Sequence, residues 1–311
     1  MRTTGLLFGV ALVVFVIVGF LGSAAQALPT PVFEFKFDET GVGAANTGSA
    51  GSSSDLITDK GVYSGATNYN LKGQAGPSGA ITDNALDTSP MVAGLYPGEP
   101  YCPNFRVNSP NVGGISGLQT ATWSGWFNTS EPFSTSEQKF LMSKGGWSTG
   151  FQIRTSTSTA DTLEVMLGGT TSYGTTSFDV SSVFEYDDNG IWQFWAVTYD
   201  GSLTSNNLKL YWGGVSTSVA QVGTTQTADR GTLSDTSSND FGLNMNIGVD
   251  YVAGYSVDGL TDNARIFDSV LSAADLETLR SGDAIPEPAT LLLVGTAALG
   301  LLGVIRRRRM K

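Results

Sequence analysis

The chain has 311 residues, of which only 14% are charged, and it contains no histidine and a single cysteine. These absences exclude a Ser-His-Asp triad, a Cys-His pair, a histidine-ligated or cysteine-rich metal site and an internal disulfide. Apart from Arg2, Arg306–Arg309, Lys311 and Glu287, the chain has 11 basic and 27 acidic side chains. Such an acidic surface repels phosphate backbones, so we expect no nucleic-acid partner.

Residues 1–27 have the three parts of a secretion signal. Arg2 supplies the basic start, an apolar run follows, and small residues come last. Ala25 and Ala27 fit the A-x-A pattern of signal cleavage, which predicts a mature chain that begins at Leu28. The alternative is an uncleaved membrane anchor.

The first strand pattern follows directly after this segment. In the run VFEFKF, three phenylalanines alternate with Glu34 and Lys36, which is typical of a strand with one buried face. From residue 40 to about residue 110, Gly, Ser, Asn, Thr and Asp dominate. This composition indicates long loops and short edge strands rather than a separate domain.

From Ala121 onward, short apolar runs rich in Val, Phe, Trp and Tyr alternate with turn residues, which predicts a series of strands. After the last of them, Ser272 is a predicted helix N-cap with Asp275 three residues on. Many antiparallel strands around one core predict an all-β fold, a sandwich of two antiparallel sheets. The predicted strand segments are 122–127, 139–144, 151–155, 163–167, 192–201, 208–214, 241–248 and 262–267.

The end of the chain combines three features. Pro286, Glu287 and Pro288 precede 17 apolar or small residues at 289–305. As a helix this run would span about 25 Å, which is a marginal bilayer crossing. Arginines cross a membrane at high cost, so the basic tail stays cytoplasmic and the large domain is predicted to lie outside. The tail at 306–311 contains Arg306, Arg307, Arg308 and Arg309.

This order of proline-flanked motif, apolar helix and arginine cluster resembles the PEP-CTERM signal of exopolysaccharide-producing bacteria with outer membranes. The resemblance implies recognition and cleavage by a membrane-embedded exosortase, with the helix attaching the protein to the inner membrane before processing. The alternative is a plain C-terminal anchor. We therefore predict a signal peptide at 1–27, a β-sandwich domain at 28–283 and a sorting signal at 284–311.

The strand motifs between the two ends resemble the laminin-G-like, concanavalin A-like lectin/glucanase domain. FKFDETGVG, TWSGWF, WQFWAVTYDG with LKLYWGG, and the closing VDGLTDNARIFDSVLSAADLETL carry the resemblance. It implies a jelly-roll sandwich and a structural Ca²⁺ held by oxygen ligands. The candidate ligands are Glu39 and Asp262, with Asp38 and Asp258 as secondary candidates. The alternative is that these acids are solvated or cap strands.

The tryptophans are the candidates for stacking against sugar rings, although most are expected in the core. Trp126 and Trp192 are expected to pack inward. Trp195 must point to the opposite face from Phe194, and it is a candidate for ligand stacking. Trp147, in the glycine-flanked loop KGGWSTG, is the other candidate.

Sandwich glucanases need carboxylates at alternating spacing on one strand face, such as E-x-D-x-x-E, and this chain lacks that pattern. We therefore expect an exported, non-catalytic protein of the cell surface or extracellular matrix that binds carbohydrate or acts in adhesion. The family resemblances link it to exopolysaccharide or biofilm. The alternatives are a structural cell-envelope protein without a small ligand and a polysaccharide hydrolase or lyase.

Overall fold

The computed structural model describes eleven ranges of the chain. Several predicted features lie outside them: the secretion helix, the segment 289–305, Trp147, Asp258 and the sorting residues from Pro286 to Arg309. In the described part of the chain, no helix has the length and apolar character to cross a membrane. The ranges are 27–39, 44–59, 72–79, 83–87, 104–107, 116–135, 138–144, 149–186, 190–234, 241–243 and 259–284.

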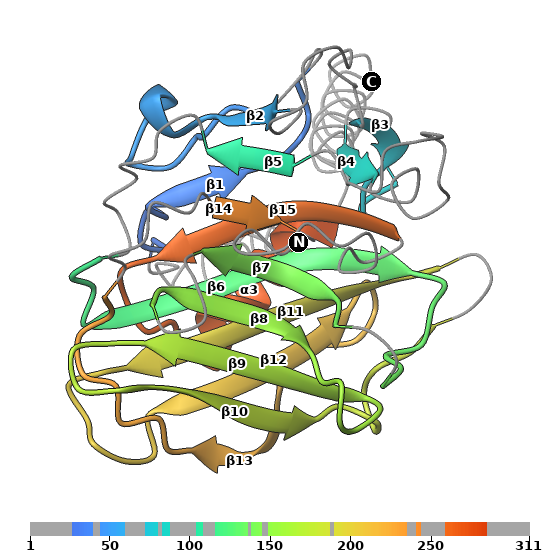
Figure 1. The fold of residues 1–311 in the computed structure, drawn as a ribbon. Coiled ribbons are helices and arrows are strands. Elements are labelled where there is room, and N and C mark those ends of the chain that lie inside the picture. Colours follow the sequence, from blue (N-terminus) through green and yellow to red (C-terminus); the bar gives the residue numbers. More distant parts are fainter. Residues whose placement is uncertain are drawn as a thin grey trace, which may run out of the picture.

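Two antiparallel sheets form a sandwich, as the sequence predicts (Figure 1). The larger sheet has the order β13-β12-β11-β6-β15-β4-β3, with β1 paired to β15, and the smaller has the order β10-β9-β8-β7-β14. A separate pair joins β2 (Leu56–Asp59) to β5 (Asn104–Val107). The larger sheet comprises β1 (Phe33–Phe35), β3 (Lys72–Ala75), β4 (Asn84–Asp87), β6 (Thr120–Thr129), β11 (Ile191–Asp200), β12 (Leu208–Gly214), β13 (Ala220–Gln226) and β15 (Gly259–Phe267). The smaller comprises β7 (Phe140–Lys144), β8 (Phe151–Thr155), β9 (Thr162–Gly168), β10 (Tyr173–Asp179) and β14 (Phe241–Leu243).

The central strands of the larger sheet are buried on both faces. On β11, Trp195 points into the core between the sheets, whereas Phe194 points to the opposite face. Leu276 and Leu279 of helix α3 (Ala273–Ala284) cover that second face. Because side chains alternate along a strand, a strand covered on both sides has an almost continuous apolar sequence. This explains the runs TWSGWF and WQFWAVTYDG.

The first and last strands of the domain are neighbours. Phe33 of β1 lies opposite Ile266 of β15 in an antiparallel pair. The predicted alternation is confirmed, because the phenylalanines of VFEFKF are buried in the main core while Glu34 lies on the other face of the strand. This pairing brings acids from both ends of the domain onto adjacent strands.

Helix α3 begins as predicted. Asp275 N–H donates to Ser272 Oγ over 3.2 Å, and Ser272 N–H donates to Asp275 Oδ2 over 3.0 Å. This reciprocal cap satisfies backbone donors that have no partner within the helix. The helix is longer than the short turn that the sequence suggests, since it continues for 12 residues to Ala284.

Candidate functional site

A cavity of about 490 Å³ lies beside the start of β11 and the end of β12. One wall is the loop that includes Ser182, Val183 and Glu185, and the other is the turn from Val215 to Ala220. The floor is formed by the strand ends at Trp192, Gln193 and Trp212, with the Trp192 side chain on the α3 face of the sheet and the Gln193 and Trp212 side chains on the core face. Strands β11 and β12 are antiparallel neighbours, with Gln193 opposite Gly214, so their pairing brings these two separate segments together. We refer to this cavity as the β11–β12 pocket.

The side chain of Gln193 holds the floor to the first wall. Its Oε1 accepts hydrogen bonds from Glu185 N–H at 2.9 Å and from the Trp212 indole N–H at 3.1 Å. Its Nε2 donates to the Glu185 carbonyl oxygen. The amide of Gln193 is buried and makes all three bonds, so it fixes the loop at Glu185 against both strands.

Helix α3 braces the second wall. Arg280 Nη1 donates to the carbonyl oxygens of Gly214 at 2.7 Å and Val215 at 2.9 Å, and Glu277 Oε2 accepts from Val219 N–H at 2.8 Å. Arg280 and Glu277 also pair with each other at 2.8 Å. The hydrogen bond from Arg280 is the largest of the causes that lower the pKa of Glu277 to about 2. The turn is thus anchored by a charge-assisted network.

The chemistry of the pocket lining is aromatic and hydroxylic. Trp192 is half-buried, and Trp212 is mostly covered. Among the described lining residues, Glu185 is the one charged side chain, and lysine and arginine are absent. Trp212, like Trp195, packs in the core, so the half-buried ring of Trp192 is the indole that can contact a ligand. An apolar ring beside a few convergent polar groups suits a ligand that is itself amphipathic, such as a sugar ring. The lining hydroxyls come from Ser182, Ser216, Thr217 and Ser218.

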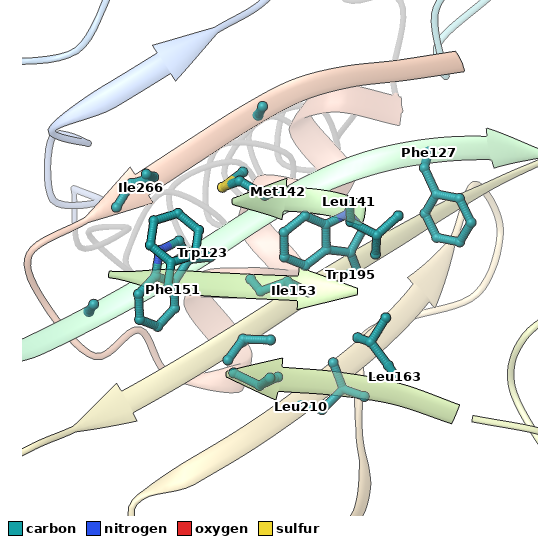
Figure 2. Packing of buried hydrophobic residues seen from close by; sticks show 14 of the residues in the cluster. Trp123, Phe127, Leu141, Met142, Phe151, Ile153, Leu163, Trp195, Leu210 and Ile266 are labelled. Atoms are coloured by element: carbon teal, nitrogen blue, oxygen red, sulfur yellow. The ribbon is translucent and has the colours of Figure 1, made fainter. Parts of the chain in front are cut away.

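Of the two tryptophans predicted to bind ligand, Trp147 is outside the described residues and Trp195 lies away from the pocket. Trp195 is 2% exposed and packs between the sheets, near Trp123 and Leu141 in Figure 2. It offers no face to a ligand, because the smaller sheet covers it, and this corrects the expectation of stacking. Trp126 is buried as expected, and Trp192 packs, partly buried, against the same cluster while it also lines the pocket.

The predicted metal ligands lie near the junction of the first and last strands. Glu39 Oε1 accepts from Ala45 N–H at 3.1 Å, and Asp38 Oδ1 accepts from Asn84 N–H at 3.0 Å. Asp262 is completely buried. Throughout the described ranges, no three acidic, histidine or cysteine side chains lie close enough together to hold a metal ion.

Asp83, which sequence reasoning missed, is the acid that meets Asp262. Asp83 lies close enough to Asp262 to affect its charge, and Asp262 accepts a hydrogen bond from Asn263 N–H at 2.6 Å. Burial first, and then the charge of Asp83, raise the pKa of Asp262 well above its usual range. Burial is the largest cause of the raised pKa of Asp38, and the nearby charge of Asp83 raises it further.

In a second cluster, the charged side chains bind one another. Arg265 donates to Glu34 at 2.8 Å, to both oxygens of Asp283 at 2.7 and 2.8 Å, and to Asn263 Oδ1 at 2.9 Å. The indole N–H of Trp126 donates to Asp283 Oδ2 at 3.0 Å. Burial would lower the pKa of Arg265, but the two carboxylates outweigh it and raise that pKa. We call these groups the Arg265 network, and its saturated contacts indicate a structural role.

The fold is a concanavalin A-like β-sandwich of two antiparallel sheets. Residues 105–277 match the family model described as "Concanavalin A-like lectin/glucanases superfamily", so the chain belongs to this superfamily. Residues 284–309 match the PEP-CTERM protein-sorting motif, which confirms that predicted resemblance. This motif implies export and exosortase processing, and it begins at Ala284, the last residue of α3.

Solved structures with a similar fold include toxin domains. The chain is similar to the receptor binding domain of botulinum neurotoxin C/D mosaic serotype, with 15% identity and a TM-score of 0.48. It is also similar to the botulinum neurotoxin type G receptor binding domain, with 10% identity and a TM-score of 0.48. Each alignment covers 81% of this chain and 51% of the toxin chain, so the chain spans about half the length of these structures. No curated protein sequence matches it.

Proposed function

We propose that this protein is an exported, non-catalytic glycan-binding module of the cell surface or extracellular matrix. The observation that carries the proposal is the β11–β12 pocket, in which the half-buried Trp192 lies among hydroxyl groups. An indole offers a flat apolar face to the C–H side of a sugar, and hydroxyl and backbone groups supply directional hydrogen bonds. Membership of a lectin/glucanase superfamily supports this use of the fold.

Binding is favoured over hydrolysis by the acids at the pocket. A glycosidase of the usual kind needs two carboxyl groups that flank the scissile bond. Among the described residues that line the pocket, Glu185 is the one carboxylate. We therefore propose recognition without bond cleavage.

The sorting motif supports a role outside the cell. We propose that the apolar segment at 289–305 holds the protein in the inner membrane until an exosortase processes the tail. The folded domain then acts on surface polysaccharide, in adhesion or in the biofilm matrix. Because the match to the motif starts where α3 ends, the folded domain and the processing signal are adjacent in the chain.

Calcium is a further part of the proposal. The carboxyl groups of Asp83 and Asp262 lie close together, and a divalent cation between them would offset their mutual repulsion. Calcium takes six to eight oxygen ligands, so main-chain carbonyls and water would have to complete the site. Such an ion would join the strand that carries Asp262 to the start of β4 and stabilise the folded domain.

A glycan array tests the function. The full chain, purified in a detergent without a sugar headgroup, should bind a defined subset of oligosaccharides. Thr217→Trp, at an exposed position of the pocket wall, should abolish this binding by filling the cavity, whereas Thr175→Trp, exposed on β10 of the other sheet, should not. No bound glycan, or equal binding by the two variants, would refute the proposed site. Concentration-dependent self-association without any sugar dependence would favour a purely structural protein.

A further inference from the structure

Tyr186 is an aromatic residue that the fold leaves at the surface beside the pocket. It is 49% exposed, and it directly follows Glu185, which lines the cavity. Its ring stacks on that of Phe184, with centroids 5.8 Å apart and planes inclined by 26°. The ring therefore has one face supported by the protein while about half of the residue remains accessible to solvent.

The support beneath Tyr186 is rigid. The ring of Phe184 stacks on Phe133 at 3.9 Å and on Phe127 at 6.2 Å. Phe127 and Phe133 are buried in the main core, so the stack continues from the surface into the packed interior. A side chain held in this way loses little conformational entropy when a ligand binds to its free face.

The same stack connects Tyr186 to the pocket. The ring of Trp212, which lines the cavity, meets Phe184 edge-on at a centroid distance of 6.4 Å. Phe184 thus contacts both the pocket indole and the exposed tyrosine ring. The hydrogen bonds of Gln193 to Glu185 hold the intervening backbone in place. Tyr186 is therefore a supported and exposed ring that directly follows the pocket residue Glu185 in the chain.

We infer that Tyr186 is the stacking platform of a second sugar subsite, and that the ligand is a neutral oligosaccharide of at least two linked sugars. This inference rests on the proposed function of the pocket. One sugar occupies the β11–β12 pocket, and the next lies against the exposed face of Tyr186. The Trp192 indole and the Tyr186 phenol can each offer an apolar face to one pyranose ring, as aromatic platforms do for successive flat groups along other polymers.

The negative charge at the pocket favours neutral sugars over acidic ones. Glu185 is the one charged group among the described pocket residues, and the chain carries a net charge of -11. A uronate, sialate or sulfated sugar would place a like charge beside this carboxylate without a cation to offset it. A neutral hexose chain meets no such repulsion, and its hydroxyls can bond to Glu185.

Titration calorimetry on the full chain, in a detergent without a sugar headgroup, tests this inference. The probes are cellohexaose, laminarihexaose, mannohexaose and xylohexaose, hexagalacturonate as the acidic counterpart, and the monosaccharide of whichever neutral hexamer binds. Tyr186→Ala should weaken hexamer binding about fivefold to tenfold and leave monosaccharide binding unchanged, whereas Tyr186→Phe should retain affinity. The matched control is Tyr173→Ala, which removes a 62% exposed tyrosine at the start of β10 and should have no effect.

The outcomes separate the two proposals. If a neutral hexamer binds and is sensitive to Thr217→Trp but not to Tyr186→Ala, the second subsite is wrong and the pocket remains. Tighter binding of hexagalacturonate would overturn the neutral class. If none of these oligosaccharides binds to the wild-type chain, the subsite inference falls together with glycan binding at this pocket. The melting temperature of Tyr186→Ala should match that of the wild type, which excludes loss of folding as the cause of weaker binding.

Discussion

The Arg265 network and the β11–β12 pocket are both polar regions of the larger sheet, but they differ in how their polar groups are used. In the network, the side chains of Arg265 and Asp283 are 5% and 9% exposed and satisfy each other. At the pocket, Glu185 and the hydroxyls of the wall remain accessible to solvent. The polar groups of the buried network are already paired, so they can stabilise the fold but cannot bind a ligand. The polar groups at the pocket are accessible and can form hydrogen bonds with one.

Helix α3 takes part in both regions. Its last turn sends Asp283 into the Arg265 network, and its middle sends Glu277 and Arg280 to the pocket wall. The same short helix therefore contributes to stability at one end and to the shape of the candidate site along its length. Substitutions in the two regions should separate these contributions.

The largest expected effect is in the Arg265 network. Asp283→Ala leaves a buried guanidinium without its bidentate partner, which should lower the free energy of unfolding by about 3–5 kcal/mol. Guanidinium chloride denaturation measures this change. Lys36→Ala is the matched control, because Lys36 pairs with Glu34 at 3.9 Å near the surface and should contribute about 0–1 kcal/mol. Similar losses from both variants would contradict the structural role of the network.

The next effect concerns the ring stack that supports the pocket. Phe184→Ala removes a buried ring from between Phe133 and Tyr186, which should cost about 3 kcal/mol of stability. Tyr186→Ala should change stability by no more than about 0.5 kcal/mol, because its ring lies at the surface. Thermal denaturation of the two variants checks this difference. A large loss in Tyr186→Ala would mean that this ring serves packing rather than binding.

Calcium gives a smaller expected effect. If an ion binds at the Asp83–Asp262 pair, millimolar Ca²⁺ should raise the melting temperature by a few degrees relative to EDTA, since a ligand of the folded state stabilises it. Asp262→Asn should remove this shift. Differential scanning calorimetry provides the measurement. An equal melting temperature in Ca²⁺ and EDTA would contradict calcium binding at this pair.

The smallest effect is the pH dependence of the α3 brace, which consists of the hydrogen bonds of Glu277 and Arg280 to the pocket wall. Hydrogen bonds from Arg280 and Val219 lower the pKa of Glu277 from 4.5 to about 2. A lowered pKa in the folded state gives stability that is present above pH 4.5 and is lost as the pH falls toward 2. In melting curves recorded between pH 5 and pH 2, Glu277→Gln should lose less stability than the wild type. Identical pH profiles would show that the brace does not depend on this charge.

Much of the fold was predictable from local patterns. The alternation around Glu34 and the Ser272–Asp275 cap correspond to observed structure because neighbouring residues determine both. Strands β10 and β13 were not predicted. They lie at the edges of the sheets and their residues are mostly exposed, so their sequences have little apolar periodicity. Edge strands rely on backbone pairing, which leaves little trace in the sequence.

The candidate site was much less predictable. Alternation places Trp195 opposite Phe194, but both faces of β11 are covered, so the pattern does not reveal which indole remains accessible. The run that contains Glu185 reads as a loop, and only the pairing of β11 with β12 brings it to Trp212. Asp83 meets Asp262 across a large sequence separation, in a region of weak pattern. Contacts of this kind depend on topology rather than on local sequence.

The most direct test of the account is a crystal structure of the protein with the neutral hexasaccharide that binds best. We predict one sugar ring in the β11–β12 pocket between Trp192 and Thr217, and the next ring stacked on Tyr186. A ligand bound elsewhere, with the pocket empty, would contradict the assignment of this site.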